Sequence, residues 1–214
     1  MTQRSDNTAH YFLPVKTIVV VTVILSVIVF LTTSAFKEKN SAADVAGYKI
    51  FSTDSTESVR AFLQVYKVLM SPRCMNCHPA GEQPLQGDDS HVHTALAQRG
   101  KDGKGLYAGK CSNCHQPENT PGLHTPPGNP KWSMPPANMK MVFQGRTARQ
   151  LALQIMDYNK NGHKNKNQLL EHARDTLVKA AWNMGEGRTP PPLAYDAFLN
   201  VWDTWIKKGG YAPK

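Results

Sequence analysis

The first forty residues contain one uninterrupted apolar segment. Residues 17–36 carry no charged side chain, and Lys16 and Lys37 flank them. At ~1.5 Å per residue, a helix of this length spans about 30 Å, which matches the hydrocarbon core of a bilayer. The pattern predicts a retained transmembrane helix. A cleavable signal peptide is the alternative, although the apolar run exceeds the usual ~7–15 residues of a signal core. Both interpretations indicate export or membrane attachment.

Helical periodicity returns after a short polar stretch. Asp54 and Glu57 have the spacing of a capping box, which predicts the start of a helix. A helix ending at Pro72 is expected to follow, with its buried face formed by Val59, Phe62, Leu63 and Tyr66.

The C-terminal third carries three further helical patterns. Thr147 is expected to cap a helix through Met156, a longer helix is expected over residues 167–183, and a last one over residues 195–208. Between the two helical regions the chain is loop-like. Six prolines between Pro121 and Pro136 exclude a regular helix or a sheet interior there. No strand pattern stands out. The predicted fold class is therefore all-α, with a single N-terminal transmembrane helix and a loop-rich domain.

These patterns divide the chain into four segments. We expect a tail at residues 1–16, the anchor at 17–36, a tether at 37–54 and one folded domain at 55–214. The 178 residues after the anchor suit one domain with a hydrophobic core.

The charge balance is basic. The whole chain carries a formal charge of +9, and 23 basic against 15 acidic side chains remain after Arg4, Lys16 and Asp6 are removed. The basic residues are scattered along a tethered chain, which argues against nucleic acid as a partner. An acidic partner, an anionic membrane surface or acidic groups on a bound cofactor would each explain the excess.

All four cysteines lie in two copies of one motif, CMNCH at residues 74–78 and CSNCH at residues 111–115. Disulfides, a zinc site and covalent haem are the three interpretations. Zinc-binding Cys-x-x-Cys pairs usually lie ~15–20 residues apart, whereas 33 residues separate Cys77 from Cys111. A zinc ribbon also gains nothing from a histidine directly after each pair. Structural disulfides generally link distant parts of a chain, whereas Cys-x-x-Cys pairs are more often redox-active, and the thioredoxin-like βαβ context is missing here. Cys-x-x-Cys-His is the attachment signal for c-type haem.

The sequence therefore predicts two covalently bound c-type haems. Cys74 and Cys77 would hold one porphyrin, and Cys111 and Cys114 the other, with His78 and His115 as the proximal iron ligands. In bacteria c-type haem is attached outside the cytoplasmic membrane. This orients the anchor in the inner membrane as a single pass, with residues 1–16 in the cytoplasm and the C-terminal domain in the periplasm.

With these motifs, the chain resembles membrane-anchored dihaem c-type cytochromes of bacteria. More narrowly, HPAGEQPLQGDD after the first motif, RGKDGKG before the second, and PPGNPKWSMPP resemble small cytochromes described as isoquinoline 1-oxidoreductase subunits. The resemblance spans roughly residues 67–210. It implies electron transfer with a redox protein partner, such as a molybdenum hydroxylase or a respiratory complex.

The second axial ligand of each iron stays open at this stage. For the first haem we expect His93, ahead of His91, from the loop between the motifs. For the second haem Met139 and His172 rank together, ahead of Met134. The weaker alternatives are Met70, Met141 and His124. A methionine ligand raises the haem potential and a second histidine lowers it.

Three functions follow from these expectations. The leading one is electron transfer, as a tethered periplasmic relay or as the redox subunit of an oxidoreductase. The alternative is a dihaem peroxidase with one open iron site, which would need acid–base residues above that iron. A structural subunit whose haems only stabilise the fold is the third.

Overall fold

The computed structural model describes the backbone of residues 42–214 and the side chains of residues 53–214. The chain divides into two compact units, residues 1–51 and residues 52–214. The expected tail and anchor at residues 1–36 lie outside the described residues. Within residues 42–214, no helix is both long enough and apolar enough to cross a membrane.

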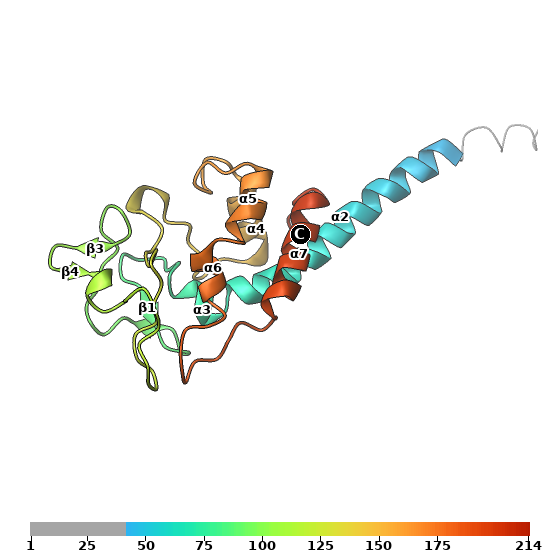
Figure 1. The fold of residues 1–214 in the computed structure, drawn as a ribbon. Helices are drawn as coiled ribbons and strands as arrows, with labels where there is room; N and C mark the ends of the chain where they lie inside the picture. Colours follow the sequence, from blue (N-terminus) through green and yellow to red (C-terminus); the bar gives the residue numbers. More distant parts are fainter. Residues whose placement is uncertain (1–41) are drawn as a thin grey trace, which may run out of the picture. The chain divides into compact units, whose positions relative to one another are not determined.

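The second unit is mostly helical, as the sequence predicted. Its longer helices are α2 (Ala42–Leu69), α4 (Ala148–Met156) and α7 (Tyr195–Lys207). The first residues of α2 belong to the first unit. The shorter helices are α3 (Pro72–Met75), α5 (Lys166–His172) and α6 (Thr176–Ala180). Figure 1 shows these helices on one side of the unit and the long loops on the other.

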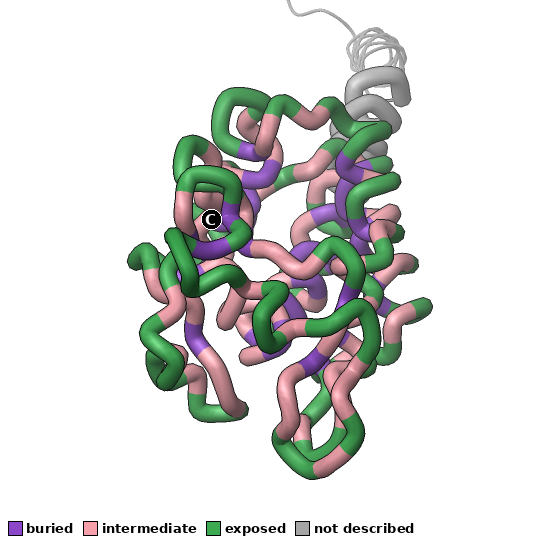
Figure 2. Tube along the Cα trace, turned by 60° about the vertical axis from the view of Figure 1, so that its left-hand side comes forward, coloured by how far each residue is buried: buried purple, intermediate pink, exposed green. Residues whose placement is uncertain are grey.

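The hydrophobic core joins α2, α4, α5 and α7. Phe62 of α2 lies against Trp205 of α7, with ring centroids 4.4 Å apart, and both side chains are fully buried. Trp202 donates its Nε1–H to the Leu169 carbonyl of α5 at 3.0 Å. Ser58, also fully buried, donates to the Trp205 carbonyl and accepts from the Tyr211 amide. In Figure 2 the buried positions gather along these helices, whereas the long loops are mainly half-buried or exposed.

Local signals explain where two of the helices start and end. Thr147 and Gln150 form the reciprocal capping box at the start of α4, so this prediction is confirmed. The last predicted helix is confirmed as well, since α7 covers residues 195–207 and Gly209 follows with a φ of 114°.

Three expectations about the helices were wrong. Asp54 does not begin a helix, because α2 already runs from Ala42 and the Asp54 carboxylate instead pairs with Lys208 at 2.9 Å. The buried face of α2 includes Ala61 and Val65, whereas Leu63 is 41% exposed. The expected helix over residues 167–183 breaks between α5 and α6, where Asp175 accepts from the Leu177 amide and caps a new helix.

The loop region contains two small hairpins that periodicity did not predict. Strand β1 (Leu85–Gln86) pairs with β2 (His91–Val92), and β3 (Gly105–Leu106) pairs with β4 (Gly109–Lys110). Each strand has only two residues, too few for an alternating pattern. The first hairpin follows the first cysteine motif and the second immediately precedes the other, so both bear on the geometry of the site.

Candidate functional site

The first motif lies on one short helical turn. Pro72 occupies the first position of α3. A backbone N–H at this position has no partner within the helix, so the absence of one in proline costs no hydrogen bond. The turn continues through Cys77, whose amide donates to the Cys74 carbonyl, and His78, whose amide donates to Met75. The two thiols and the histidine are therefore held by one compact piece of backbone directly after α2.

The second motif has an equivalent but tighter turn. A 3₁₀ helix spans Cys111–Asn113, and the amides of Cys114 and His115 both donate to the Cys111 carbonyl. Hairpin β3–β4 leads into it, and the Cys111 amide donates back to Lys104. The two motifs thus present two thiols and a histidine in the same order on turns of similar size.

All four cysteines are free thiols. Burial raises the pKa of Cys74 to about 12 and that of Cys77 to about 11, and it also raises the pKa of Cys111. Within residues 53–214, no group of three or more His, Cys, Asp or Glu side chains is gathered to hold a metal ion. The cysteines therefore form two reduced Cys-x-x-Cys pairs, in which burial favours the protonated thiol at Cys74, Cys77 and Cys111.

The His78 ring is fixed on two sides. Its Nδ1 lies 2.7 Å from the Met141 carbonyl, and its face stacks on Phe143 with 3.9 Å between centroids and 5° between planes. A carbonyl only accepts, so Nδ1 carries the proton and Nε2 keeps its lone pair. Burial lowers the pKa of His78 to about 4; the Met141 hydrogen bond opposes this shift, while nearby His172 and Arg99 add to it. His78 is therefore a neutral imidazole with a defined tautomer.

His115 repeats this arrangement with different partners. Its Nδ1 lies 2.7 Å from the Pro127 carbonyl, and its ring stacks on Trp132 with 4.2 Å between centroids and 10° between planes. Burial lowers the pKa of His115, with the Pro127 hydrogen bond opposing the shift. Within the described residues, Nε2 of neither motif histidine has a hydrogen-bond partner. Both rings are thus oriented through Nδ1 and leave Nε2 available.

The loop histidines expected near the first motif separate. His93 lies beside His115, with ring centroids 6.3 Å apart and planes inclined at 60°. His91 is exposed, and its Nδ1 lies 2.6 Å from the Asp89 carboxylate. The structure therefore brings His93 to the histidine of the second motif, not to that of the first.

A cavity of about 1210 Å³ opens between these residues. We call it the His115 cavity. It is lined by Cys111, Cys114, His115 and His93, and also by Cys77 of the first motif. Its volume exceeds the ~300–1,000 Å³ of ordinary small-molecule pockets.

The other candidates take different positions. Met134 is buried and lines the His115 cavity. Met139 ends the 3₁₀ helix Ala137–Met139, half-buried beside Gly162. His172, the last residue of α5, is exposed and close enough to His78 to lower its pKa. The Met141 sulfur accepts from Gln154 at 3.3 Å.

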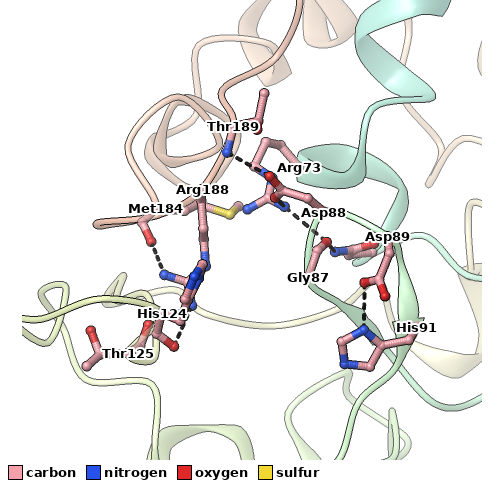
Figure 3. A network of polar contacts seen from close by, with 11 residues as sticks. Arg73, Gly87, Asp88, Asp89, His91, His124, Thr125, Met184, Arg188 and Thr189 are labelled. Atoms are coloured by element: carbon pink, nitrogen blue, oxygen red, sulfur yellow. Dashed lines mark hydrogen bonds and ion pairs between the residues drawn. The ribbon is translucent and has the colours of Figure 1, made fainter.

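A polar network closes one wall of the cavity (Figure 3). Arg73, with only 3% of its side chain exposed, pairs with Asp88 at 2.5 Å, and Asp88 also accepts from the Thr189 amide at 3.0 Å. In the same network, Arg188 donates to the carbonyls of Met184, His124 and Thr125. The Nε of Arg73 is buried without a hydrogen-bond partner. This network joins the first motif, the proline-rich loop and the segment before α7.

Sequence reasoning missed part of this site. Met184 and Arg188 line the cavity from a loop about 70 residues beyond Cys114, and no sequence motif around them indicates a site. The carbonyls of Met141 and Pro127 are backbone atoms, which leave no trace in side-chain identity. In comparisons with known proteins, the chain matches no protein-family model, no curated protein sequence and no solved structure.

Proposed function

We propose that this chain is an electron-transfer protein that binds two c-type haems. One observation carries the proposal: each Cys-x-x-Cys turn ends in a histidine whose Nδ1 is held by a carbonyl and whose Nε2 is free. A hydrogen bond at Nδ1 fixes the tautomer and increases the basicity of Nε2, which is how proteins prepare a histidine to bind a metal.

The residues around the second motif fit a porphyrin. The His115 cavity has ample volume, and two free thiols and the histidine line it together. It also contains guanidinium groups suited to anionic carboxylates, since both Arg73 and Arg188 line it and the buried Nε of Arg73 lacks a partner. A haem, which carries two propionates, would use each of these features.

The residues around the first motif support a second haem on different grounds. Cys74 and Cys77 are free, and His78 has the same tautomer and the same aromatic stacking as His115. The pKa of Cys77 is raised first by burial and then by the nearby Cys111. The two motifs are thus neighbours in space, which suits electron exchange between their cofactors.

When bound, each haem would supply a one-electron couple of iron. The chain's own residues then have three tasks. The thiols would fix the porphyrin, and the two motif histidines, oriented by the carbonyls of Met141 and Pro127, would hold the iron. The stacked Phe143 and Trp132 would keep water from the imidazole faces. No hydrolytic or acid–base chemistry is needed for this role.

The partner and the location belong to the same proposal. An N-terminal anchor at residues 17–36 would tether the domain to the periplasmic face of the bacterial inner membrane. The basic excess favours an acidic docking surface on a redox partner, such as a molybdenum hydroxylase or a respiratory complex.

The test is to express the full chain in a bacterium that attaches c-type haem and to measure covalent haem per chain. Two haems per chain are expected from the intact mass and from the pyridine haemochrome spectrum. Changing Cys111 and Cys114 together to alanine should remove one haem and leave the other, and changing Cys74 and Cys77 should do the converse. A purified chain with no covalent haem, or with stoichiometric zinc, would overturn the proposal.

A further inference from the structure

His93 comes from the loop after the first motif but lies against the histidine of the second. The two imidazoles are inclined to each other in a T-shaped arrangement, with 6.3 Å between ring centroids and 60° between planes. From this pair we propose that His93 and His115 are the two axial ligands of the haem attached at Cys111 and Cys114. The inference rests on the proposed function and adds the coordination of one of its two irons.

The separation of the rings matches a shared metal ion. Metal–imidazole bonds are ~2.0–2.1 Å long, so an ion between two histidines separates their ligating nitrogens by ~4 Å. The remainder of the 6.3 Å between ring centroids corresponds to the distance from each centroid to its own ligating nitrogen. Trp132 covers one face of the His115 ring, which leaves the other face and the ring edge for the inclined ring of His93.

The nitrogen atoms are assigned by their hydrogen bonds. His115 uses Nδ1 for the Pro127 carbonyl, which leaves Nε2 for iron. In His93, the Ala95 amide donates to Nδ1 over a longer 3.2 Å, and binding iron through Nε2 would move the proton to Nδ1 and end this contact. Among the described residues, no carbonyl is bonded to the Nδ1 of His93 to receive this proton. His93 is therefore the less basic and more easily displaced ligand of the two.

The path of the chain explains why His93 reaches the second motif. The hairpin β1–β2 is anchored on the first motif, because the Leu85 amide donates to the Asn76 carbonyl. The His93 amide donates to Pro84, which fixes the residue just after β2. The first motif thus positions a ligand for the second haem, and loss of this hairpin would disturb both sites.

Four other side chains that line the His115 cavity could compete for this iron. They are His91, Met134, Met184 and His124. The ring contact with His115, however, is made by His93. Arg188 donates to the carbonyls of both Met184 and His124, which holds the backbone of these two residues in place.

The experiment compares the full-length chain with His93→Gly and with His163→Gly as the matched control. His163 is exposed, has a positive φ of 57° that glycine tolerates, and does not line the His115 cavity, so its loss should leave both haems unchanged. Electron paramagnetic resonance and near-infrared magnetic circular dichroism report the axial ligands of each ferric haem. His93→Gly should convert half of the total haem from low-spin to high-spin, and added imidazole should restore the low-spin form.

A second variant guards against a folding failure. His93→Met should keep two haems per chain, replace one bis-histidine signature by a histidine–methionine signature, and raise one midpoint potential. An intact chain with no bis-histidine haem would overturn the inference, and so would a His93→Gly chain whose two haems keep their spectra. Absence of covalent haem from the intact chain is a separate result, since it refutes the proposed function itself.

Discussion

The ring of His115 lies flat against that of Trp132, with 10° between their planes and 4.2 Å between their centroids. Together with the Pro127 hydrogen bond, this stack fixes the rotation of the imidazole about its axis. Trp132 therefore acts on the site through a neighbouring ring, without touching the proposed iron.

Replacing this aromatic face should loosen the second site. We expect Trp132→Leu to lower the free energy of unfolding by at least the ~0.5–1.5 kcal/mol of an aromatic pair. With haem bound as proposed, it should also broaden the electron paramagnetic resonance signal of one haem, because the imidazole plane is less fixed. Chemical denaturation and spectra of the same preparation measure both effects.

The chain offers two controls for this variant. Trp132→Phe keeps an aromatic face and should leave the spectrum close to that of the parent. Phe143→Leu removes the corresponding stack on His78 and should disturb the other haem. If Trp132→Leu and Phe143→Leu change the same haem, the assignment of one aromatic face to each motif is wrong.

Gly128 allows the close approach that presents the Pro127 carbonyl. A Cβ atom at this position would overlap the carbonyl of Glu118 and press on that of Gln116. Gly128→Ala should therefore push the 127–129 segment away from His115 and weaken its Nδ1 hydrogen bond. We expect a lower unfolding temperature and a smaller yield of the second haem than of the first.

The control for this variant is Gly81→Ala. An added Cβ at Gly81 meets nothing within 4 Å, and its φ is not positive. Haem content measured by pyridine haemochrome, with separate cysteine variants to identify each haem, distinguishes the two outcomes. Equal haem yields from Gly128→Ala and Gly81→Ala would contradict the role given to the Pro127 carbonyl.

Asp88 links the first motif to the segment before α7 and makes this link sensitive to pH. Hydrogen bonds from Thr189 and the charge of Arg73 hold the pKa of Asp88 below its usual value. A carboxylate with a depressed pKa stabilises the fold above its unfolded-state pKa, and the contribution disappears as pH falls through the folded-state pKa. Asp88→Asn should therefore lower the unfolding temperature at neutral pH, with little difference from the parent in strong acid.

Thermal unfolding of both chains across this pH range checks the sign. Asp89→Asn is the comparison, because Asp89 contacts the exposed His91 and does not touch the Arg73–Thr189 link. A constant difference between Asp88→Asn and the parent at every pH would show that the carboxylate charge is not what matters.

Much of the helical fold could be predicted because its signals are local. Thr147 and Gln150 form the capping box at the start of α4, and Gly209 follows α7 in the left-handed conformation. The break between α5 and α6 was missed because Asp175 can lie within a helical pattern or cap a new helix, and tertiary packing decides which. The face of α2 was also predicted wrongly, since Leu63 fits the periodicity but faces solvent.

The candidate site also has a part that could be predicted from sequence and a part that could not. The two motifs are visible in sequence because thiols and histidine are side chains at fixed spacing. What orients each histidine is a backbone carbonyl, at Met141 or Pro127, and no residue type encodes it. The contact between His93 and His115 depends on the register of a hairpin with two residues in each strand. Such a short strand leaves no periodicity, so proximity in sequence suggested the first motif instead.

Ser58 links α2 to α7 and to the C-terminal segment through two hydrogen bonds. Its hydroxyl donates to the Trp205 carbonyl at 2.9 Å and accepts from the Tyr211 amide at 3.1 Å, and the side chain is fully buried. Ser58→Ala leaves the Tyr211 amide without this acceptor, so we expect a loss of ~1–3 kcal/mol in the free energy of unfolding. Thr56→Ala, at an exposed position two residues earlier on α2, should change it by less than ~0.5 kcal/mol. Because Ser58 lies in the core and outside the His115 cavity, both chains should keep the same haem spectra, and a Ser58→Ala chain with altered spectra would show that the core and the site are coupled.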